Sequence, residues 1–354
     1  MMMRGAWALA GLACVLSCGG RPEGGRASES AGGTIDTGRT ATAENRPGAA
    51  KTLAAPAENA TRYDTLGNRL GRIPILEYHV IGDSSRGLFI ISREKFRRDL
   101  QLLYDRGYRP ITVAQLLDKD FSAVPSGMSP VVFTFDDASP GQFSYVERNG
   151  QLEIDSTTAL GIWLRFEREH PDWKGRATFC LLPGGEIGHA FFGDDPKWRG
   201  QKNSWRHRKV KWLADNGFEL CSHTLWHAQL SKYPDAFVQE QIARGQLAID
   251  SVVPGYRVRT FALPQGLWPK NRELAWRGSW TNPRTGKTTR YDHETVLQVA
   301  GGPARSPFDP EFDKRSLPRV IAFGNAVEKT LDQLDATKTR FVWDGRGVAG
   351  PATR

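Results

Sequence analysis

The chain has 354 residues, of which 39% are hydrophobic, and it carries a formal charge of +9. This composition supplies a core for one large domain or two ordinary ones, and it excludes a protein that spans a membrane many times. Arg and Lys are scattered and accompany no helix-turn-helix or RNA-binding signature, so binding to nucleic acid is not expected. The charge predicts a solvated basic surface, or attraction to an anionic polymer such as a cell-wall glycan.

The first residues are typical of an export signal. Arg4 precedes an apolar run that is too short to span a bilayer and that ends in Val-Leu-Ser-Cys at Cys18. This ending is similar to a bacterial lipobox, so we expect residues 1–17 to be a lipoprotein signal peptide and Cys18 to carry the lipid. The protein would then lie in the cell envelope, on the outer membrane or facing the periplasm, with plain secretion as the alternative.

Residues 18–69 consist mainly of Gly, Ala, Thr, Glu, Arg and Pro, with almost no large apolar residue. Such a segment cannot bury enough surface to fold, so it predicts a disordered tether. A folded domain is expected over residues 70–345.

Within 70–345, short apolar runs alternate with amphipathic stretches. The amphipathic stretches, which predict helices, are 93–106, 204–216 and 235–252. The apolar runs, which predict strands, are 73–79, 108–111, 131–135, 177–182, 218–221, 258–263 and 295–299. Strands that alternate with helices indicate a parallel β/α architecture, open or barrel-shaped.

Two stretches interrupt this alternation. Residues 143–154 alternate around Asn149-Gly150, which is a strong signal for a hairpin with a type I′ turn. Residues 277–291 contain further turn signals, Asn282-Pro283 and Thr285-Gly286, preceded by Trp276 and Trp280. We expect both to project on the loop side of the sheet, where parallel β/α folds gather their catalytic groups.

Two adjacent carboxylates, Asp136 and Asp137, follow the most hydrophobic run. Like charges at contact distance raise one another's pKa, so the pair costs stability unless a cation or a reaction uses it. Because successive strand side chains point to opposite faces, the two can share a site only where the strand dissolves into a loop. The following Ala138-Ser-Pro-Gly141 indicates such a loop, although Asp residues also cap turns for local reasons.

Two imidazoles follow another strand end. His223 and His227 lie on one face if the turn between them is helical, which is the arrangement that a divalent metal needs. With one carboxylate they make a three-ligand site with open positions. Structural roles for these histidines are the alternative.

A third strand ends in Pro264, Gln265 and Gly266. This ending predicts either a plain β-turn or a close backbone approach that aims the Gln265 N–H at a developing oxyanion.

These motifs, in this order, resemble those of the polysaccharide deacetylases, carbohydrate esterase family 4, over most of residues 73–321. The matching stretches are PILEYH from Pro74, TFDD from Thr134, ATFCLLPG from Ala177, NGFELCSHTLWH from Asn216 and FALPQG from Phe261. The resemblance implies an α/β fold, a distorted and incomplete (β/α) barrel.

The resemblance also implies a site and a reaction. Asp137, His223 and His227 would hold one divalent metal, usually Zn²⁺, with Co²⁺, Ni²⁺, Mn²⁺ and Fe²⁺ as alternatives. Asp136 would be the general base, and the Gln265 N–H would help to stabilise the oxyanion. The expected substrate is an acetylated polysaccharide of the cell envelope or the extracellular space. The enzyme would remove its acetyl groups, and N-acetyl groups are favoured over O-acetyl groups.

The sequence departs from the family at two points. Many members carry an Arg that contacts the base two residues before the third-motif Pro, where this chain has Ala262, and Arg259 is the nearest Arg on that strand. The late His that acts as general acid has no clear match. His79 is our candidate for that role, with His293 as the other, and Arg319 is interpreted as structural.

Three further residues are predicted to contact the sugar, namely Trp226, Pro264 and Trp268, with core packing as the alternative for the Trp residues. Cys180 and Cys221 follow apolar, strand-like patterns and are either buried thiols or a disulfide, which the sequence leaves open.

Two other functions remain as alternatives. The missing acid and Ala262 motivate a non-catalytic glycan-binding lipoprotein that keeps the metal site. A metal-dependent hydrolase acting on a non-sugar amide is the other.

Overall fold

The computed structural model describes residues 67–185, 189–193 and 200–347. The predicted signal peptide 1–17, Cys18 and nearly all of the tether lie outside the described residues. Asn68 already belongs to the folded part, because its backbone N–H donates to the Val342 carbonyl at 2.8 Å. Arg69 pairs with Asp344 at 2.7 Å, so the folded domain begins before the predicted boundary at residue 70. Among the described residues, no helix has both the length and the apolar character required to cross a bilayer.

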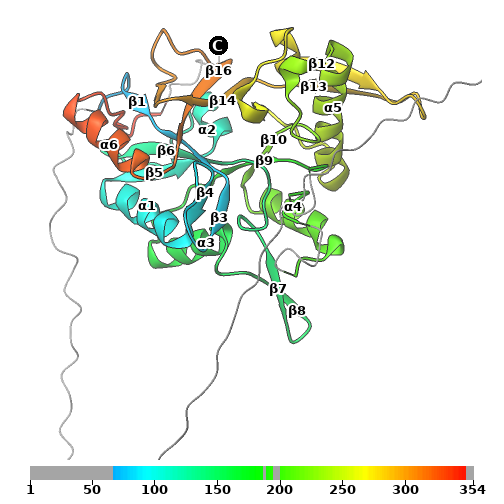
Figure 1. The fold of residues 1–354 in the computed structure, drawn as a ribbon. Helices are drawn as coiled ribbons and strands as arrows, with labels where there is room; N and C mark the ends of the chain where they lie inside the picture. The colour runs from blue at the N-terminus through cyan, green and yellow to red at the C-terminus, as the bar shows by residue number, and fades with distance from the viewer. Residues whose placement is uncertain (1–66, 186–188, 194–199, 348–354) are drawn as a thin grey trace, which may run out of the picture. The chain divides into compact units, whose positions relative to one another are not determined.

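Seven parallel strands close into a barrel (Figure 1). In spatial order they are β2 (Ile75–Tyr78), β16 (Ser316–Ile321), β14 (Thr295–Gly301), β11 (Thr260–Ala262), β10 (Glu219–Ser222), β9 (Thr178–Leu181) and β6 (Ser129–Phe135), which pairs again with β2. An additional strand, β5 (Tyr108–Ile111), pairs with the first half of β6. The prediction of a distorted, incomplete (β/α) barrel is therefore confirmed, with one strand fewer in the ring than a full eight.

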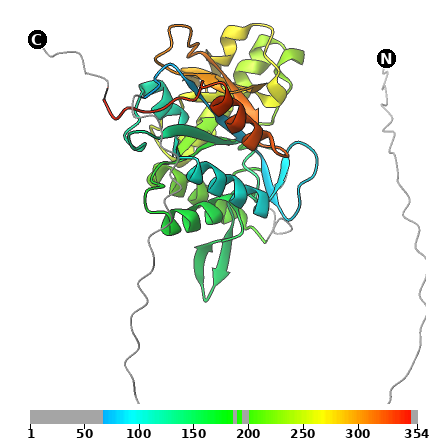
Figure 2. The same cartoon turned by 90° about the vertical axis from the view of Figure 1, so that its left-hand side faces the viewer.

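Helices cover the outside of this barrel (Figures 1 and 2). They are α1 (Arg93–Asp105), α2 (Val113–Asp118), α3 (Ala159–Glu169), α4 (Arg206–Asp215), α5 (Asp235–Val252) and α6 (Ala326–Ala336). In α1, Ser92 caps the first turn, and Phe96, Leu100 and Leu103 recur at helical spacing on the buried face. Figure 2 shows α1 lying between α3 and α6 on one side of the barrel.

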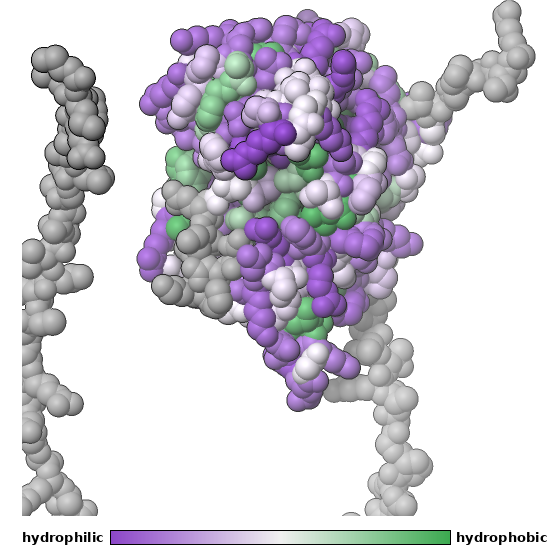
Figure 3. All heavy atoms as spheres, turned by 90° about the vertical axis from the view of Figure 1, so that its right-hand side faces the viewer, coloured by the Kyte–Doolittle hydropathy of each residue, from purple (hydrophilic) through white to green (hydrophobic). Residues whose placement is uncertain are grey.

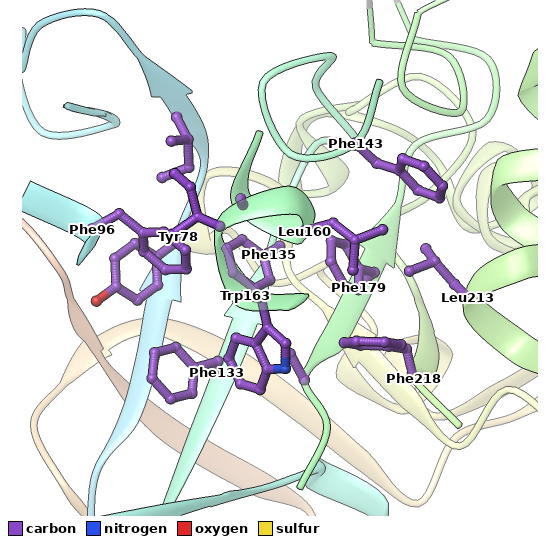
Figure 4. Packing of buried hydrophobic residues seen from close by; sticks show 14 of the residues in the cluster. Tyr78, Phe96, Phe133, Phe135, Phe143, Leu160, Trp163, Phe179, Leu213 and Phe218 are labelled. Atoms are coloured by element: carbon purple, nitrogen blue, oxygen red, sulfur yellow. The ribbon is translucent and has the colours of Figure 1, made fainter. Parts of the chain in front are cut away.

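The main hydrophobic core lies between the barrel and these helices (Figure 4). Outward-facing aromatic residues of β2 and β6 fill it: Tyr78 packs edge-on against Phe96, and Phe133 against Trp163, with ring centroids 5.2 and 5.0 Å apart. Alternate residues on the same strands point into the barrel. At the carboxyl end of β6 the next inward position is Asp136, so the register of the core places this carboxylate inside the barrel mouth.

A disulfide joins Cys180 on β9 to Cys221 on β10. The two residues are directly paired in the register of these neighbouring strands, and both are fully buried. The structure thus decides the question that the sequence left open.

Both predicted excursions are hairpins. The first consists of β7 (Tyr145–Arg148) and β8 (Gln151–Ile154), and its turn residues Asn149 and Gly150 have φ of 52° and 74°, as a type I′ turn requires. The second consists of β12 (Arg277–Thr281) and β13 (Thr288–Asp292).

Short elements complete the described chain. They are β1 (Arg72–Ile73), which pairs with β15 (Ala304–Arg305), β3 (Val80–Gly82), which pairs with β4 (Ile90–Ser92), and 3-10 turns at Asn203–Trp205, Leu230–Lys232, Pro264–Gly266 and Arg272–Ala275. On the face shown in Figure 3, hydrophilic residues predominate and hydrophobic ones form small separate patches.

Candidate functional site

Asp136 and Asp137 reach one site because the backbone changes conformation between them. Asp136 continues the inward face of β6, whereas Asp137 and Ala138 have φ of 75° and 51°, which takes the chain out of the strand. Such left-handed conformations are costly for residues with a side chain and persist where the surrounding structure enforces them. The loop that the sequence predicted after the Asp pair therefore exists.

His223 and His227 also come together, but not through a helical turn. Thr224 and His227 have φ of 65° and 61°, so the predicted helical spacing is wrong in its detail. The Thr224 hydroxyl instead accepts the His227 N–H at 3.0 Å and closes a tight turn. This turn brings the two imidazole centroids to 4.8 Å of one another.

One oxygen of Asp137 faces both imidazoles. Its Oδ1 lies 3.3 Å from His223 Nε2 and 3.6 Å from His227 Nε2, and one ligand atom from each of the three residues lies within 4.8 Å of the others. The His223 Nδ1–H donates to the Ala262 carbonyl at 2.9 Å, which directs the lone pair of Nε2 toward Asp137.

This donor set fits a divalent metal. Asp137 Oδ1 and His223 Nε2 are buried, and neither has a hydrogen-bond partner within the described part of the chain. Buried polar atoms are normally paired, so two ligand atoms that face each other at 3.3 Å without a hydrogen-bond partner among the described residues match a cation site. Burial and the neighbouring His223 lower the pKa of His227 to about 4, which keeps it in the neutral form that binds metals.

Asp136 is held by an arginine. Arg319, on β16, donates from Nη1 to Oδ1 at 2.9 Å and from Nη2 to Oδ2 at 2.8 Å, and neither side chain is exposed. Burial opposes ionisation of Asp136, but the Arg319 charge and His223 hold its pKa below the ordinary value. Asp136 is thus an ionised carboxylate in a buried position, next to the three candidate ligands.

Glu77 on β2 and His79, which directly follows that strand, lie beside this pair. Glu77 Oε2 is 3.0 Å from Arg319 Nε, and its Oε1 is 3.5 Å from His79 Nε2. Burial raises the pKa of Glu77 to about 8 despite Arg319. Burial also lowers the pKa of His79, against the attraction of Asp136. At neutral pH, Glu77 is therefore protonated and His79 neutral.

A buried amide ties these strand ends together. The Gln142 Nε2 group donates to the His79 carbonyl at 2.8 Å and to the Asp136 carbonyl at 2.5 Å. His79, the predicted general acid, consequently lies next to Asp136, and atoms of Glu77, His79 and Asp136 approach within 4.8 Å of one another.

A cavity of about 390 Å³ opens onto the site. Its lining consists of Asp137, Leu182, Gly185, His189, Trp226, His227 and Gln265. Trp226 is 49% exposed, so its ring is available to a ligand. Gln265 has φ of 56° and its side-chain oxygen accepts from Gln229 at 2.6 Å.

The other candidates lie elsewhere. His293 stacks on the outward-facing Phe261, with centroids 5.2 Å apart, and bonds the Ala275 carbonyl, so it packs outside the barrel. Arg259 pairs with Asp118 and Glu294 at the opposite end of β11.

Two residues that were predicted to contact sugar are less accessible than Trp226. Pro264 is buried, and Trp268 packs between Trp276 and Arg272.

The sequence interpretation missed the roles of Arg319, Glu77 and Gln142 in this geometry. Glu77 had a usable signal, because it is a charged residue at an inward position of an apolar strand that the sequence predicts, and buried charges are rarely without a task.

Residues 174–277 match the family model described as polysaccharide deacetylase. The matched segment runs from β9 to the start of β12 and contains His223, His227 and Gln265. This segment is therefore similar to the polysaccharide deacetylases. It makes up less than a third of the chain, and Asp136 and Asp137 lie before it.

Solved structures of deacetylases share the fold of this chain. BA0330 from Bacillus anthracis is 18% identical, with a TM-score of 0.51 over 74% of this chain and 69% of that one. The Streptococcus pyogenes deacetylase PplD is 16% identical, with a TM-score of 0.50 over 74% and 98% of the two chains. BC0361, a polysaccharide deacetylase from Bacillus cereus, is 17% identical, with a TM-score of 0.50 over 75% and 69%. The search of curated proteins by sequence returns no match.

Proposed function

We propose that this protein is a metal-dependent hydrolase that removes acetyl groups from a polysaccharide of the cell envelope or the extracellular space, most readily N-acetyl groups. One observation carries the proposal. A carboxylate and two imidazoles converge directly beside a second carboxylate that an arginine keeps ionised, and the converging atoms of Asp137 and His223 are buried without a hydrogen-bond partner among the described residues. This is the donor set and the base that water activation requires.

Asp137, His223 and His227 are the residues that would hold the metal, and Zn²⁺ suits two imidazoles and one carboxylate best. When bound, a divalent ion lowers the pKa of a water molecule and polarises an acetyl carbonyl. Asp136 accepts the proton of the attacking water. The Gln265 N–H, at the edge of the cavity, donates to the oxygen that gains charge.

Glu77 and His79 supply the proton that the leaving nitrogen needs. At neutral pH the proton resides on Glu77, whose Oε1 lies 3.5 Å from His79 Nε2. Glu77 passes the proton to His79, and His79 protonates the departing amine. Over one turnover the proton that Asp136 gains offsets the one that Glu77 loses, so exchange with solvent restores the starting state.

Two features weigh against a non-catalytic glycan-binding protein. That alternative was motivated by Ala262 and by the missing acid. Arg319 contacts the base in place of an arginine at position 262, and His79 stands beside the base.

The polymer is to be identified by acetate release. Chitin oligomers, poly-N-acetylglucosamine, peptidoglycan and acetylxylan would be compared, with and without a chelator. We expect release from at least one N-acetylated polymer, its loss with chelator, and its recovery when Zn²⁺ or another divalent metal is restored. Asp118→Asn, which removes a carboxylate at the opposite end of the barrel, is the control and keeps activity. Release that persists after complete metal removal would contradict the proposal.

We also propose that the protein is a lipoprotein, anchored to an envelope membrane through Cys18. Incorporation of labelled palmitate that is abolished in Cys18→Ser, with the protein moving from the membrane to the soluble fraction, is the expected result. Equal fractionation of the two proteins would refute the anchor.

A further inference from the structure

Arg319 is a fully buried cation inside the barrel. Its side chain is 0% exposed, and it lies among the inward residues of the barrel. An arginine cannot lose its charge at any ordinary pH, so burying one is costly unless carboxylates and hydrogen bonds surround it. Its fork to Asp136 is bidentate, the strongest arrangement that a guanidinium and a carboxylate can form.

The barrel builds a cradle for this guanidinium. Arg319 Nε donates to the Gln298 carbonyl at 2.6 Å, and Nη1 also donates to Thr134 Oγ1 at 3.0 Å. Glu77 lies on the remaining side. The Gln298 and Thr134 acceptors lie on β14 and β6, so two further strands fix the guanidinium plane independently of Asp136.

The Gln298 carbonyl is available because β14 is irregular. Between the Leu297–Leu317 pair and the Gly301–Arg319 pair, β14 advances four residues while β16 advances two. Gly301 has φ of 124°, and a Cβ there would lie 2.7 Å from Pro318 Cβ, so only glycine fits. Such bulges re-aim backbone groups next to active sites.

The strand that usually supplies the base-contacting arginine lacks one. Position 262 on β11 is a buried alanine, and Arg259 of that strand is engaged at the other end of the barrel. The space beside Asp136 is occupied from β16 instead, 183 residues away in sequence.

We propose that Arg319 is the positioning residue of Asp136, and that in this protein the role has moved from the third-motif strand to β16. The fork uses one lone pair on each carboxylate oxygen and fixes the plane of the carboxylate. The remaining lone pairs then point in set directions, toward the water that Asp136 deprotonates. The inference rests on the proposed function, because it assigns the arginine to the base of that reaction.

The first test is kinetic. The probe is 4-nitrophenyl acetate, whose leaving group departs without a proton, so its hydrolysis depends on the base and not on His79 or Glu77. We expect Arg319→Ala to lower kcat by about 100-fold, within the range that a general base contributes, with KM and bound metal near wild type. Guanidinium added to this variant restores part of kcat, and urea, a neutral molecule of the same shape, does not.

Arg319→Lys serves if the alanine variant does not fold. It keeps the charge but cannot form the fork, so kcat falls while metal content is kept. Arg109→Lys is the matched control, because Arg109 is also buried and pairs with a carboxylate, Asp172, outside the site. Arg109→Lys lowers stability and leaves kcat unchanged. An unchanged kcat in both Arg319 variants would overturn the inference, as would equal rescue by urea.

A second test does not depend on turnover. Denaturant unfolding of Asp136→Asn, Arg319→Met and the double variant forms a thermodynamic cycle. We expect strong coupling, with the double variant more stable than the sum of the single effects. Additive effects would refute the pairing. If the wild type hydrolyses no acetyl substrate but the coupling is present, the proposed function fails while the positioning contact stands.

Discussion

One glutamate is buried at each end of the barrel interior, and the two differ in the hydrogen bonds that their oxygens accept. At the amino-terminal end of the strands, Glu219 accepts hydrogen bonds from the Thr178 hydroxyl, the Thr260 hydroxyl and the Ala114 N–H, at 2.9, 2.7 and 2.9 Å. At the carboxyl end, the oxygens of Glu77 accept no hydrogen bond from the described residues.

Burial raises the pKa of both glutamates. The surroundings of Glu219 satisfy its oxygens, so it serves the stability of the barrel. The oxygens of Glu77 face an arginine and a histidine, so its proton can be moved. A buried carboxylate therefore indicates a functional site only when its oxygens lack the hydrogen-bond donors that a structural role would supply.

The largest expected effect is on kcat, which should fall on substitution of a carboxylate at the carboxyl end of the barrel but not at the amino-terminal end. Asp136→Asn removes the base, so we expect kcat for acetate release to fall by about 1,000-fold while bound metal changes little, and Tm to fall because the buried Arg319 loses its charged partner. Glu219→Gln, at the opposite end, should keep kcat within about threefold. Substantial activity in Asp136→Asn would break the comparison, because the carboxyl end would then hold no essential carboxylate at that position.

Substitution of a candidate metal ligand should lower the affinity for the metal and leave the base, Asp136, in place. We expect His223→Ala to weaken Zn²⁺ binding by more than about 100-fold, since even an outer partner of a ligand is worth 10- to 100-fold. Calorimetric titration of the metal-free protein measures this. The control is His293→Ala, which removes a buried imidazole outside the barrel and should bind metal as the wild type does.

The proton on Glu77 should appear in the pH dependence of turnover. With a pKa of about 8, Glu77 holds its proton at neutral pH and loses it as the pH rises through 8, so activity on an N-acetyl substrate should decline above that point. Glu77→Gln cannot ionise, and we expect the decline to move to higher pH or vanish, with a lower kcat at neutral pH. An alkaline limb that is identical in the two proteins would rule out this source of the proton.

Glu219 should affect stability with a definite sign. Its pKa is raised in the folded state, so the folded protein binds the proton more tightly than the unfolded chain. The stabilisation is complete at a pH below the unfolded value and is lost as the pH rises through the folded pKa. Glu219→Gln should therefore gain stability relative to wild type as the pH rises from acid to neutral, as measured by urea unfolding across that range. A pH-independent difference would contradict the assignment.

The smallest effect is expected at the bulge. Gly301→Ala forces a side chain into a left-handed position against Pro318, which disturbs the carbonyl that holds Arg319. We expect a loss of about 1–3 kcal/mol in unfolding free energy and a moderate drop in kcat. Gly150→Ala, also left-handed but in the open hairpin turn with nothing nearby, is the control and should lower stability only.

Local signals in the sequence were enough for several elements. Asn149-Gly150 specifies a type I′ turn through its own backbone preferences, and the hairpin follows. Asp137, His223 and His227 could be grouped because all three come after strand ends, and parallel strands end on one rim. The turn between the two histidines could not be predicted, because left-handed φ values at Thr224 and His227 are imposed by tertiary contacts.

The strand β16 was not predicted, for a related reason. Pro318 and Arg319 interrupt its apolar run, so the pattern does not indicate a buried strand. Arg319, which interrupts the apolar pattern, is the residue that pairs with Asp136. The two residues are 183 positions apart, so their contact produces no pattern in the local sequence. Sequence reasoning fails here because a functional requirement overrides the hydrophobic pattern.

The cross-link between Cys180 and Cys221 lies in the barrel wall with both sulfur atoms sealed from solvent. An oxidant cannot reach these thiols once the ring of strands has closed, so the bond has to form in a chain that is still open. A reductant likewise acts only on molecules that open. The rate at which a thiol reagent labels these cysteines under reducing conditions consequently measures the rate at which the barrel opens.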